Sequence, residues 1–328
     1  MKSAYIATTL IVAGAAAHGA ILSENQYQFL FSKYATSFNK TYDVKDVVGK
    51  YVAFKENIDI ILEHNRSNST FTMGVNQFAD MTLEEFRDYV NLNKVLANAG
   101  RVEDTEPIIQ EQSHVALNTV DWTPYGPPIG NQFDCGSCWA FATSATYSYH
   151  YGFSIKKQGP ELSSQQLVDC DTKSNGCDGG QMSHALEWIQ SNNGLCYESY
   201  YPYTARVGKC HDGCPKIYKP FTIRNVKNEN HLNDVLTSIG PAAVAIDASD
   251  RSFMFYKSGI ISDPGRNNLN HGVVAVGFGS ENGVNYTKLR NSWGSGWGES
   301  GHFRIVHGRN TLSIAFSMQI GMAVYPQM

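Results

Sequence analysis

Two cysteines in the segment NQFDCGSCWAF, residues 131–141, stand at C-x-x-C spacing, Cys135 and Cys138. This spacing serves three chemistries: a dithiol redox pair, one half of a zinc site, or a nucleophilic thiol beside a structural cysteine. A thioredoxin-like pair expects a strand just before the motif, but the loop TPYGPPIGNQ precedes it here. Zinc needs a second pair of ligands, and Cys210 and Cys214 at C-x3-C spacing offer one.

The nucleophile interpretation gains from residues far downstream. A thiol nucleophile needs a base, and the base needs a group that holds its tautomer. His271 and Asn291 offer both, and each lies at the end of a predicted strand. The redox and zinc interpretations stay open on spacing alone, but the distant His and Asn favour a nucleophilic Cys138.

The elements that must position these residues fall into two halves. Before them, YVAFKENIDIILEHN has apolar residues at helical spacing, residues 71–75 alternate like a strand, and Asp80 or Thr82 is expected to cap another helix. Next, SSQQLVDC and MSHALEWIQSNNG indicate helices, with Gly194 ending the second. After Phe221, β character dominates in PAAVAIDA, HGVVAVGFGS, NYTKLRNSW and HFRIVHG.

The sheet half contains one strong local signal, since Asn282-Gly283 predicts a tight hairpin turn. With the helices before the strands, the nucleophile would come from a helical half and the base from a sheet half. The expected fold is therefore α+β, with a cleft between two lobes.

Composition narrows the function classes. The chain has 328 residues, 42% hydrophobic content and a net charge of −4. Nucleic-acid binding needs a concentrated basic patch, and electrostatic membrane binding needs more positive charge than this. We expect neither.

The first 20 residues read as a secretory signal peptide: a lysine, an apolar run and then small residues. No later segment reaches membrane-spanning length, so a soluble exported protein without a membrane anchor is expected. Export favours disulfides, and the seven cysteines leave one thiol over when the others pair. N-glycosylation sequons fit the same compartment; they begin at Asn39, Asn65, Asn68 and Asn285.

Taken together, these motifs resemble a papain-family cysteine protease of the cathepsin L type. Cys135-Gly136-Ser137-Cys138-Trp139 matches the signature C-G-[SA]-C-[WY]. The resemblance runs from residue 25 to about 325 and includes Gln132, LSSQQLVDC, GCDGG, ESYYPY, NHGVVAVGFG and NSWGSGWGESGHFRI. It implies a papain-like two-lobed fold, with a helical left lobe, an antiparallel β-barrel-like right lobe and a mainly helical prodomain.

The resemblance assigns catalytic roles position by position. Cys138 would be the nucleophile at a helix N-terminus, where the helix dipole and an imidazolium favour the thiolate. His271 would accept and return the proton, and Asn291 would orient His271. Gln132 would donate its amide to the oxyanion, together with the Cys138 backbone N–H. Trp293 would shield the bond between His271 and Asn291 from water.

The resemblance also implies a substrate cleft and endopeptidase action, because no His-His insertion caps the cleft. The main side-chain pocket would be mostly apolar, without an acid at its base, and would prefer Leu, Val or Phe over Arg two residues before the cut. Its lining falls on Gln181, Met182, Ala245, Leu269 and Ser317. Further substrate-binding positions are Gly136, Gly179, Gly180, Asn270 and Trp293.

By family position, three disulfides are implied: Cys135–Cys177, Cys170–Cys210 and Cys196–Cys214, with Cys138 left free. A further family disulfide is missing, because Pro264 and Leu312 stand about where its cysteines would be.

The domains implied are a signal peptide 1–20, an inhibitory propeptide 21–115 and a peptidase domain 116–328. The propeptide motif GVNQFAD, residues 74–80, is intact, whereas Val47 and Tyr51 replace a usual Glu and Arg. We expect acid to loosen the propeptide by protonating carboxylates such as Asp80. Two further departures from the family are Phe133-Asp134, where small residues are usual, and Asn270 in place of Asp.

The partners implied are protein and peptide substrates, the chain's own propeptide as inhibitor, and cystatin-type inhibitors. No cofactor, metal or nucleic acid is implied, and a monomer is expected. The location would be the secretory pathway, with a lysosome, a vacuole or the outside as destination. Two alternatives remain: a non-catalytic binding or inhibitory protein on the same scaffold, and a transpeptidase with the same Cys-His machinery.

Overall fold

The computed structural model describes residues 21–91, 119–218, 221–224, 226, 228–316 and 321–323. The predicted signal peptide, residues 92–118 and Ser317 lie outside the described residues. The described chain belongs to two compact units, residues 1–42 and 43–328. In the first unit, helix α1 spans Glu24–Ser37, and Gln26 Oε1 accepts the Ser23 backbone N–H at 2.7 Å.

The second unit begins with three elements that the sequence patterns anticipate: helix α2 (Val47–Arg66), strand β1 (Phe71–Met73) and helix α3 (Leu83–Asn91). Thr82 caps α3, since its hydroxyl accepts the Glu85 N–H at 3.1 Å and Glu85 Oε2 accepts the Thr82 N–H at 2.8 Å. This reciprocal pair is a capping box. The predicted strand is too long, because Val75 lies beyond β1 and is 44% exposed.

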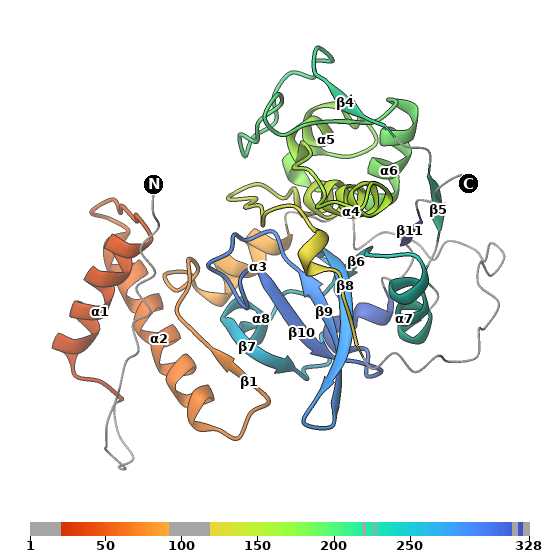
Figure 1. The fold of residues 1–328 in the computed structure, drawn as a ribbon. Helices are drawn as coiled ribbons and strands as arrows, with labels where there is room; N and C mark the ends of the chain where they lie inside the picture. Colours follow the sequence, from red (N-terminus) through yellow and green to blue (C-terminus); the bar gives the residue numbers. More distant parts are fainter. Residues whose placement is uncertain are drawn as a thin grey trace. The chain divides into compact units, whose positions relative to one another are not determined.

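The helical half contains both predicted helices, and its helix α4 lies where this half meets the sheet half (Figure 1). Helix α4 contacts α5 and α6 on one side and strands β6 and β8 on the other. The elements between residues 120 and 217 are β2 (Val120–Asp121), which joins the main sheet, and η2 (Thr123–Tyr125), α4 (Cys138–Ser154), α5 (Ser164–Cys170), η3 (Gly176–Asp178), α6 (Met182–Ser191), β3 (Leu195–Cys196) and β4 (Lys216–Ile217).

The sheet half contains every predicted strand, but also two helices that the β-rich pattern did not indicate, α7 and α8. Asn228 caps α7 by accepting the His231 N–H at 2.9 Å, a local signal for a helix start. The elements are β5 (Thr222–Arg224), α7 (Glu229–Ser238), β6 (Ala242–Ile246), α8 (Arg251–Met254), β7 (Tyr256–Ile261), β8 (His271–Glu281), β9 (Val284–Arg290), β10 (His302–Val306), η4 (Thr311–Phe316) and β11 (Gly321–Ala323).

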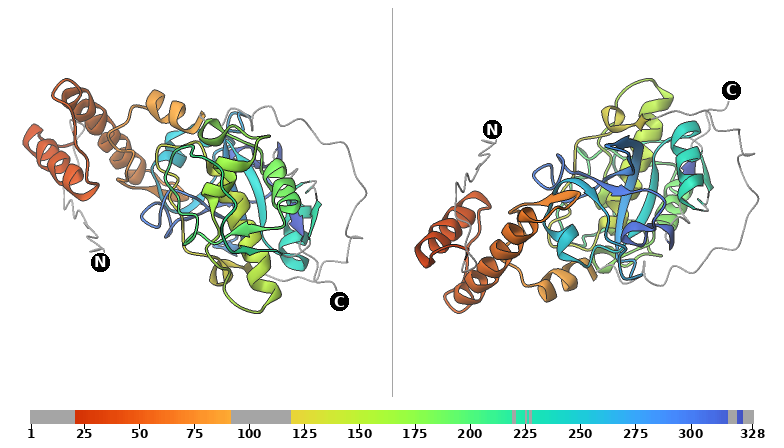
Figure 2. Two further views of the ribbon diagram at one scale, coloured as in Figure 1. Left: turned by 90° about the horizontal axis from the view of Figure 1, so that it is seen from above. Right: turned by 90° about the horizontal axis from the view of Figure 1, so that it is seen from below.

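The main sheet has the strand order β1-β7-β10-β9-β8-β2, with β6 also paired to β8. Its pairs are antiparallel except β10 with β7. Asn282 and Gly283 turn β8 into β9 with φ of 52° and 78°, which confirms the predicted hairpin and fits a type I′ turn. Figure 2 shows the same elements from above and from below.

Strand β1 joins this sheet from far away in the sequence. It pairs antiparallel with β7, with Phe71 opposite Gly259. The Ile260 N–H donates to the Thr70 carbonyl at 2.9 Å. Residues 43–91 therefore dock on the sheet half through backbone hydrogen bonds.

Three disulfides stabilise the helical half: Cys135–Cys177, Cys170–Cys210 and Cys196–Cys214. They are the three pairs that the resemblance implies. Each of the first two closes a loop of about 40 residues, and cross-links of this kind stabilise mainly by restricting the unfolded chain.

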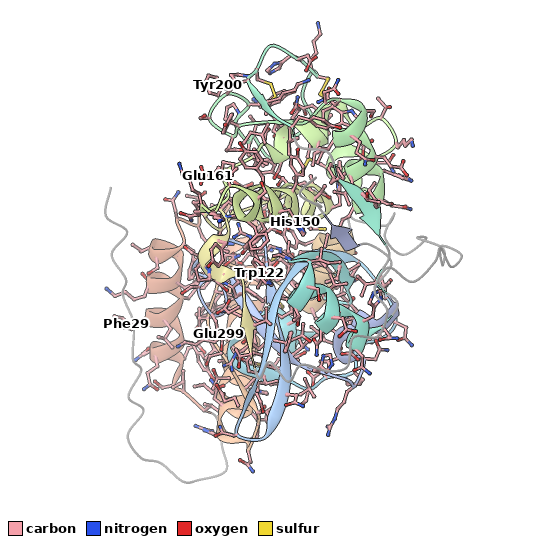
Figure 3. The ribbon with its side chains drawn as sticks, turned by 45° about the vertical axis from the view of Figure 1, so that its right-hand side comes forward. Phe29, Trp122, His150, Glu161, Tyr200 and Glu299 are labelled. Atoms are coloured by element: carbon pink, nitrogen blue, oxygen red, sulfur yellow. A yellow bond between two sulfur atoms is a disulfide. The ribbon has the colours of Figure 1, made fainter. Side chains whose placement is uncertain are left out.

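A buried histidine lies on α4 where the helix faces the sheet half. His150, labelled in Figure 3, is almost fully buried, and its Nε2 lies 2.8 Å from the Pro241 carbonyl, to which it donates. Burial lowers the pKa of His150 to about 4, against the opposing effect of that hydrogen bond. The imidazole is therefore neutral in the folded chain at neutral pH.

This burial predicts a loss of stability in acid. An unfolded histidine has a pKa of about 6.5, so the unfolded chain binds the proton first, and the free energy of unfolding falls as the pH drops from about 6.5 toward 4. In a Cys138→Ala background, His150→Gln should reduce the difference in unfolding free energy between pH 8 and pH 5 by about 2 kcal/mol. Urea titrations at the two pH values measure this difference.

The matched control is His211→Gln, because His211 is exposed. This variant should keep the pH dependence of the parent. If His150→Gln also kept it, His150 would not be the group that couples folding to protons.

Candidate active site

Cys138 is the first residue of α4 and the free cysteine among the described residues. The preceding loop is held in place, since the Gly136 N–H donates to the Cys177 carbonyl at 2.8 Å beside the Cys135–Cys177 disulfide. Cys138 is only 1% exposed, and its Sγ accepts the Gly272 N–H at 3.2 Å. The thiol therefore lies directly against the start of strand β8.

His271 is the first residue of β8 and precedes Gly272, which contacts the thiol. Pairing of β8 with β6 fixes this strand, with Ile246 opposite His271 and Ala245 opposite Gly272. Because α4 packs on β8, the Cys138 thiol contacts Gly272, the residue that follows His271.

Asn291 follows β9 and holds the far side of the imidazole. Its Oδ1 lies 2.7 Å from His271 Nε2 and also accepts the Ser292 N–H at 2.8 Å. An amide oxygen only accepts, so His271 Nε2 carries a proton and Nδ1 of the neutral ring is the free base.

Trp293 packs against the same histidine. The two ring centroids are 4.8 Å apart, and Trp293 is almost fully buried. His271 is itself 1% exposed, and its burial lowers the pKa of His271 to about 4, although the hydrogen bond to Asn291 opposes the shift. In the described form the imidazole is therefore neutral at neutral pH, and a charged imidazolium would require access of water.

Gln132 is fixed at both ends of its side-chain amide. Nε2 donates to the Cys135 carbonyl at 3.0 Å, and Oε1 accepts the Ser292 hydroxyl at 2.7 Å. Ser292 therefore sets which end of the amide faces the loop before Cys138. No sequence pattern assigns Ser292 a role, although it stands next to Asn291 in the NSW motif.

Tyr203 is a second residue at the site that no sequence pattern assigns to it. Its hydroxyl donates to the Gln132 carbonyl at 2.8 Å, so the Ser137 hydroxyl, 2.6 Å away, must donate to Tyr203. Tyr203 thus ties the Gln132 loop to the residue before the nucleophile. Its only sequence signal was its place in ESYYPY.

The glycines predicted to bind the substrate backbone lie beside helix α4. Gly179 has a φ of 107°, which other residues rarely adopt. At Gly180, a Cβ atom would come within 2.5 Å of the Trp139 ring, so only glycine fits there. Both glycines follow η3, which contains Cys177, the disulfide partner of Cys135.

Two of the predicted pocket residues, Met182 and Ala245, lie next to Gly272. Met182, the first residue of α6, is fully buried, and its sulfur would lie 3.3 Å from a Cβ at Gly272. Ala245 is opposite Gly272 in the sheet, and Leu269 packs against the same core. Gln181 directly precedes α6; the predicted pocket residue Ser317 lies outside the described residues.

The side chain of Asn270 is buried and bonds to residues that follow β6. Its Oδ1 accepts the Ala248 N–H at 2.9 Å, and its Nδ2 donates to the Ser249 hydroxyl at 2.7 Å. The side chain therefore fixes the turn after β6 while its backbone precedes His271.

Residues of the N-terminal part cover the site. The rings of Phe78, Phe86 and Tyr89 lie 4.9, 5.9 and 6.2 Å from the Trp293 ring. Gln77 Nε2 also donates to the Trp293 carbonyl at 3.0 Å. An aromatic cluster thus seals the side of the site where His271 lies.

Over the part of the chain that the structure describes, no group of three or more His, Cys, Asp and Glu side chains could hold a metal ion. Within the same residues, no helix combines the length and the apolarity that crossing a membrane requires.

Comparison with known proteins gives two family matches. Residues 117–322 match the family described as papain family cysteine protease, and residues 31–86 match the cathepsin propeptide inhibitor domain (I29). Cysteine proteinase 5 of Dictyostelium discoideum is 34% identical over 323 residues, covering 90% of this chain and 92% of its own. Caricain of Carica papaya is 36% identical over 280 residues, 82% of this chain and 78% of its own.

Solved structures agree with the sequence matches. Digestive procathepsin L 3 from the larval midgut of Tenebrio molitor has a TM-score of 0.80 and 33% identity, covering 90% of this chain and 99% of its own. The predicted two-lobed fold with a helical prodomain is therefore confirmed.

Proposed function

Because the chain belongs to the papain family of cysteine proteases and carries a cathepsin propeptide inhibitor domain, we propose that it is a thiol endopeptidase in which Cys138, His271 and Asn291 carry the chemistry. The observation that supports this best is the free Cys138 thiol against Gly272, with the neighbouring His271 bonded to Asn291 at 2.7 Å. Catalysis by a thiol requires a nucleophile, a base that takes its proton and a group that orients the base, and these three residues would supply them.

The proposed reaction has two stages. Cys138 Sγ attacks the carbonyl carbon of the scissile bond while His271 Nδ1 takes the thiol proton. His271 returns that proton to the leaving nitrogen, the carbon–nitrogen bond breaks, and an acyl-enzyme remains. Water then attacks the acyl carbon with His271 as base, which releases the acid and restores the thiol.

Gln132 would stabilise the oxyanion. Its Nε2 has two N–H groups, and one donates to the Cys135 carbonyl, so the second is the donor for the substrate oxygen. The Ser292 hydroxyl on Oε1 keeps the amide in this orientation. A donor that is already oriented stabilises developing charge without reorganisation.

The propeptide would inhibit by covering the site. Besides the β1–β7 pairing, the Gly74 N–H donates to the Phe255 carbonyl at 2.8 Å, and Asn76 Nδ2 donates to the Met254 carbonyl at 2.7 Å. We propose that acid weakens this cover and that the boundaries are near 20 and 115, as the family pattern implies. An isolated 21–115 segment should inhibit the mature enzyme at neutral pH.

The Lys50–Glu85 pair, 2.8 Å apart, joins α2 to α3 and is a candidate acid-sensitive contact. Partial burial acts in the opposite direction, but hydrogen bonds from Lys50 and the Thr82 backbone lower the pKa of Glu85 below 4.5. Glu85 is thus a second carboxylate, more accessible than Asp80, whose protonation would loosen the propeptide. The pair also joins the propeptide helices where Val47 and Tyr51 replace a usual ion pair.

Export, with a lysosome, a vacuole or the outside as destination, remains a proposal that rests on the N-terminal sequence and the disulfides. Asn39, Asn68 and Asn285 are exposed and could carry glycans. Asn65 is a poorer acceptor, because its amide bonds both the Met73 N–H and the Met73 carbonyl. Cystatin-type inhibitors and a monomeric state are proposed on family grounds alone.

The mechanism predicts distinct effects for two residues. After removal of the propeptide by an added protease, Cys138→Ala should abolish hydrolysis of a fluorogenic peptide, because the nucleophile is gone. Gln132→Ala should lower kcat by about 10²- to 10³-fold, the usual effect of losing one oxyanion donor. Gln158→Ala, an exposed glutamine in the same lobe, should stay within about twofold. Equal rates for Cys138→Ala and the wild type would reject the mechanism.

The pocket predicts substrate preference. Because Met182 and Ala245 are apolar and Gln181 is uncharged, peptides with Leu, Val or Phe two residues before the cut should be cleaved faster than those with Arg. A peptide library measures the order. If the peptides with Arg two residues before the cut were cleaved fastest, the pocket would be assigned to the wrong residues.

The Lys50–Glu85 pair predicts the pH of activation. A carboxylate with a lowered pKa keeps its ion pair above its ordinary titration range and loses it as the pH falls below about 4.5. Glu85→Gln removes the pair at every pH, so self-cleavage should begin at a higher pH than in the wild type. Glu84→Gln, an exposed neighbour in the same helical turn, should not move the onset; an equal shift in both variants would contradict this role.

A further inference from the structure

Ser137 stands at the N-cap of α4, but its side chain does not cap the helix. A serine at this position usually accepts a backbone N–H of the first turn through its hydroxyl, and the Ser137 hydroxyl makes no such bond. It lies instead 2.6 Å from the Tyr203 hydroxyl. Only the Ser137 carbonyl serves the helix, since it accepts the N–H groups of Ala140 and Phe141 at 2.9 and 3.1 Å. The hydroxyl of a fully buried serine is thus used outside its own helix.

The Tyr203 hydroxyl makes two hydrogen bonds through one oxygen atom. It donates to the Gln132 carbonyl at 2.8 Å and accepts the Ser137 hydroxyl. Burial raises the pKa of Tyr203 to about 12, while the hydrogen bond from Ser137 opposes the shift. The phenol therefore keeps its proton near neutral and acidic pH, and the hydrogen bond to Gln132 keeps its donor.

Tyr203 is itself held in place by two contacts. Its backbone N–H donates to Glu198 Oε1 at 2.7 Å, and its ring packs edge to face on the Phe141 ring, with centroids 4.7 Å apart. Phe141 belongs to α4, the helix that begins at Cys138. The phenol is therefore fixed relative to α4, and through its hydrogen bond it fixes Gln132 relative to the same helix.

A cavity lies behind the loop that carries Gln132. It has a volume of about 250 Å³ and lies between this loop, α4 and β8, with Asn131, Phe141, Tyr203 and Ser292 among its lining residues. Because side chains do not pack tightly against this side of the loop, hydrogen bonds must hold it. From the sheet half, the Ser292 carbonyl accepts the Gln132 N–H at 2.9 Å and the Ser292 hydroxyl donates to Gln132 Oε1. From the helical half, the Tyr203 hydroxyl supplies the corresponding bond.

We propose that Tyr203 is a positioning residue for the oxyanion site, where it fixes the Gln132 amide relative to the Cys138 backbone N–H. The inference rests on the proposed endopeptidase function. These two donors come from separate segments, and the Tyr203 hydroxyl bonds both Gln132 and the residue directly before Cys138. Oxyanion donors are effective when they are in place before the charge develops. Loss of the hydroxyl should therefore weaken transition-state stabilisation and leave the thiol itself unchanged.

The main variant is Tyr203→Phe, which keeps the ring and removes the hydroxyl. After an added protease has removed the propeptide, kcat for a fluorogenic peptide should fall about three- to tenfold, the range for the net loss of about one hydrogen bond. KM should change by less than about twofold, because the oxyanion forms only in the transition state.

Alkylation of Cys138 by iodoacetamide separates positioning from a structural role. In this reaction the thiolate attacks a saturated carbon, a carbon–sulfur bond forms, iodide leaves, and no oxyanion develops. The rate constant reports the reactivity of the thiolate, so at a fixed pH it should stay within about twofold of the wild type in Tyr203→Phe. If kcat and the alkylation rate fell by the same factor, Tyr203 would support the thiol, and the inference would be overturned.

A Gln132→Ala background tests whether the hydroxyl acts through Gln132. Substitutions of coupled residues are not additive. The factor by which Tyr203→Phe lowers kcat should therefore shrink in this background to about its square root or less, which halves the effect on the logarithmic scale. A factor as large as in the wild type would contradict the inference.

The matched control is Tyr201→Phe. Tyr201 belongs to the same ESYYPY segment, and its hydroxyl donates to Asp169 Oδ2 at 2.9 Å rather than to the oxyanion loop. This variant also loses one hydroxyl bond in the helical half, but its kcat should stay within about twofold of the wild type. A loss of kcat equal to that in Tyr203→Phe would assign the effect to the fold of this half and overturn the inference.

Ser137→Ala keeps the test valid if Tyr203→Phe does not fold. The signature C-G-[SA]-C-[WY] accepts alanine at this position, and the Tyr203 bond to Gln132 remains. The expected loss of kcat is about threefold, at the lower end of the range for one hydrogen bond, with an unchanged alkylation rate. With Tyr203→Phe unfolded, an unchanged kcat in Ser137→Ala would overturn the inference.

The outcomes described above leave the proposed function intact, because the wild type still cleaves the peptide and Cys138→Ala does not. Failure of the activated wild type to cleave any peptide, or equal cleavage by Cys138→Ala, would instead reject the proposed function.

Discussion

The packing of helix α4 against strand β8 is the constraint on which the site depends. It places the Cys138 thiol 3.2 Å from the Gly272 N–H, at a position where Gly272 has no side chain. A Cβ there would lie 3.3 Å from the Cys138 backbone and from the Met182 sulfur, tighter than side chains normally pack. The absence of a side chain at Gly272 therefore favours the close packing of the helical half on the sheet half at Cys138.

Burial keeps His271, next to this contact between α4 and β8, uncharged. His271 is 1% exposed beneath Trp293, and the aromatic residues of the propeptide lie over that tryptophan. A dry environment disfavours an imidazolium, so the contacts that cover Trp293 also keep His271 neutral. If the propeptide inhibits as proposed, its effect would have two physical parts, occlusion of the site and exclusion of the water that a charged imidazolium needs.

The sequence predicted the family, the fold class and most strands, because a nucleophile, a base and glycines at crowded positions leave strong local patterns. It did not predict the contacts of Ser292 and Tyr203. Ser292 reaches Gln132 across 160 residues and Tyr203 reaches it across 71 residues, and no local pattern encodes such pairs. The pattern does not reveal helix α7, because its apolar residues resemble those of the surrounding strands. Val75 lies outside β1 although it fits the alternating pattern, because the alternation continues past the last hydrogen-bonded residue of the strand.

Strand β1 has a consequence beyond inhibition. It pairs with β7 at the end of the main sheet, where β7 otherwise pairs only with β10. Exposed sheet edges present unpaired N–H and carbonyl groups to any extended chain, including a second copy of the same protein. Strand β1 thus covers this edge of the sheet, and removal of residues 43–91 would leave the β7 edge unpaired and open to a neighbouring chain.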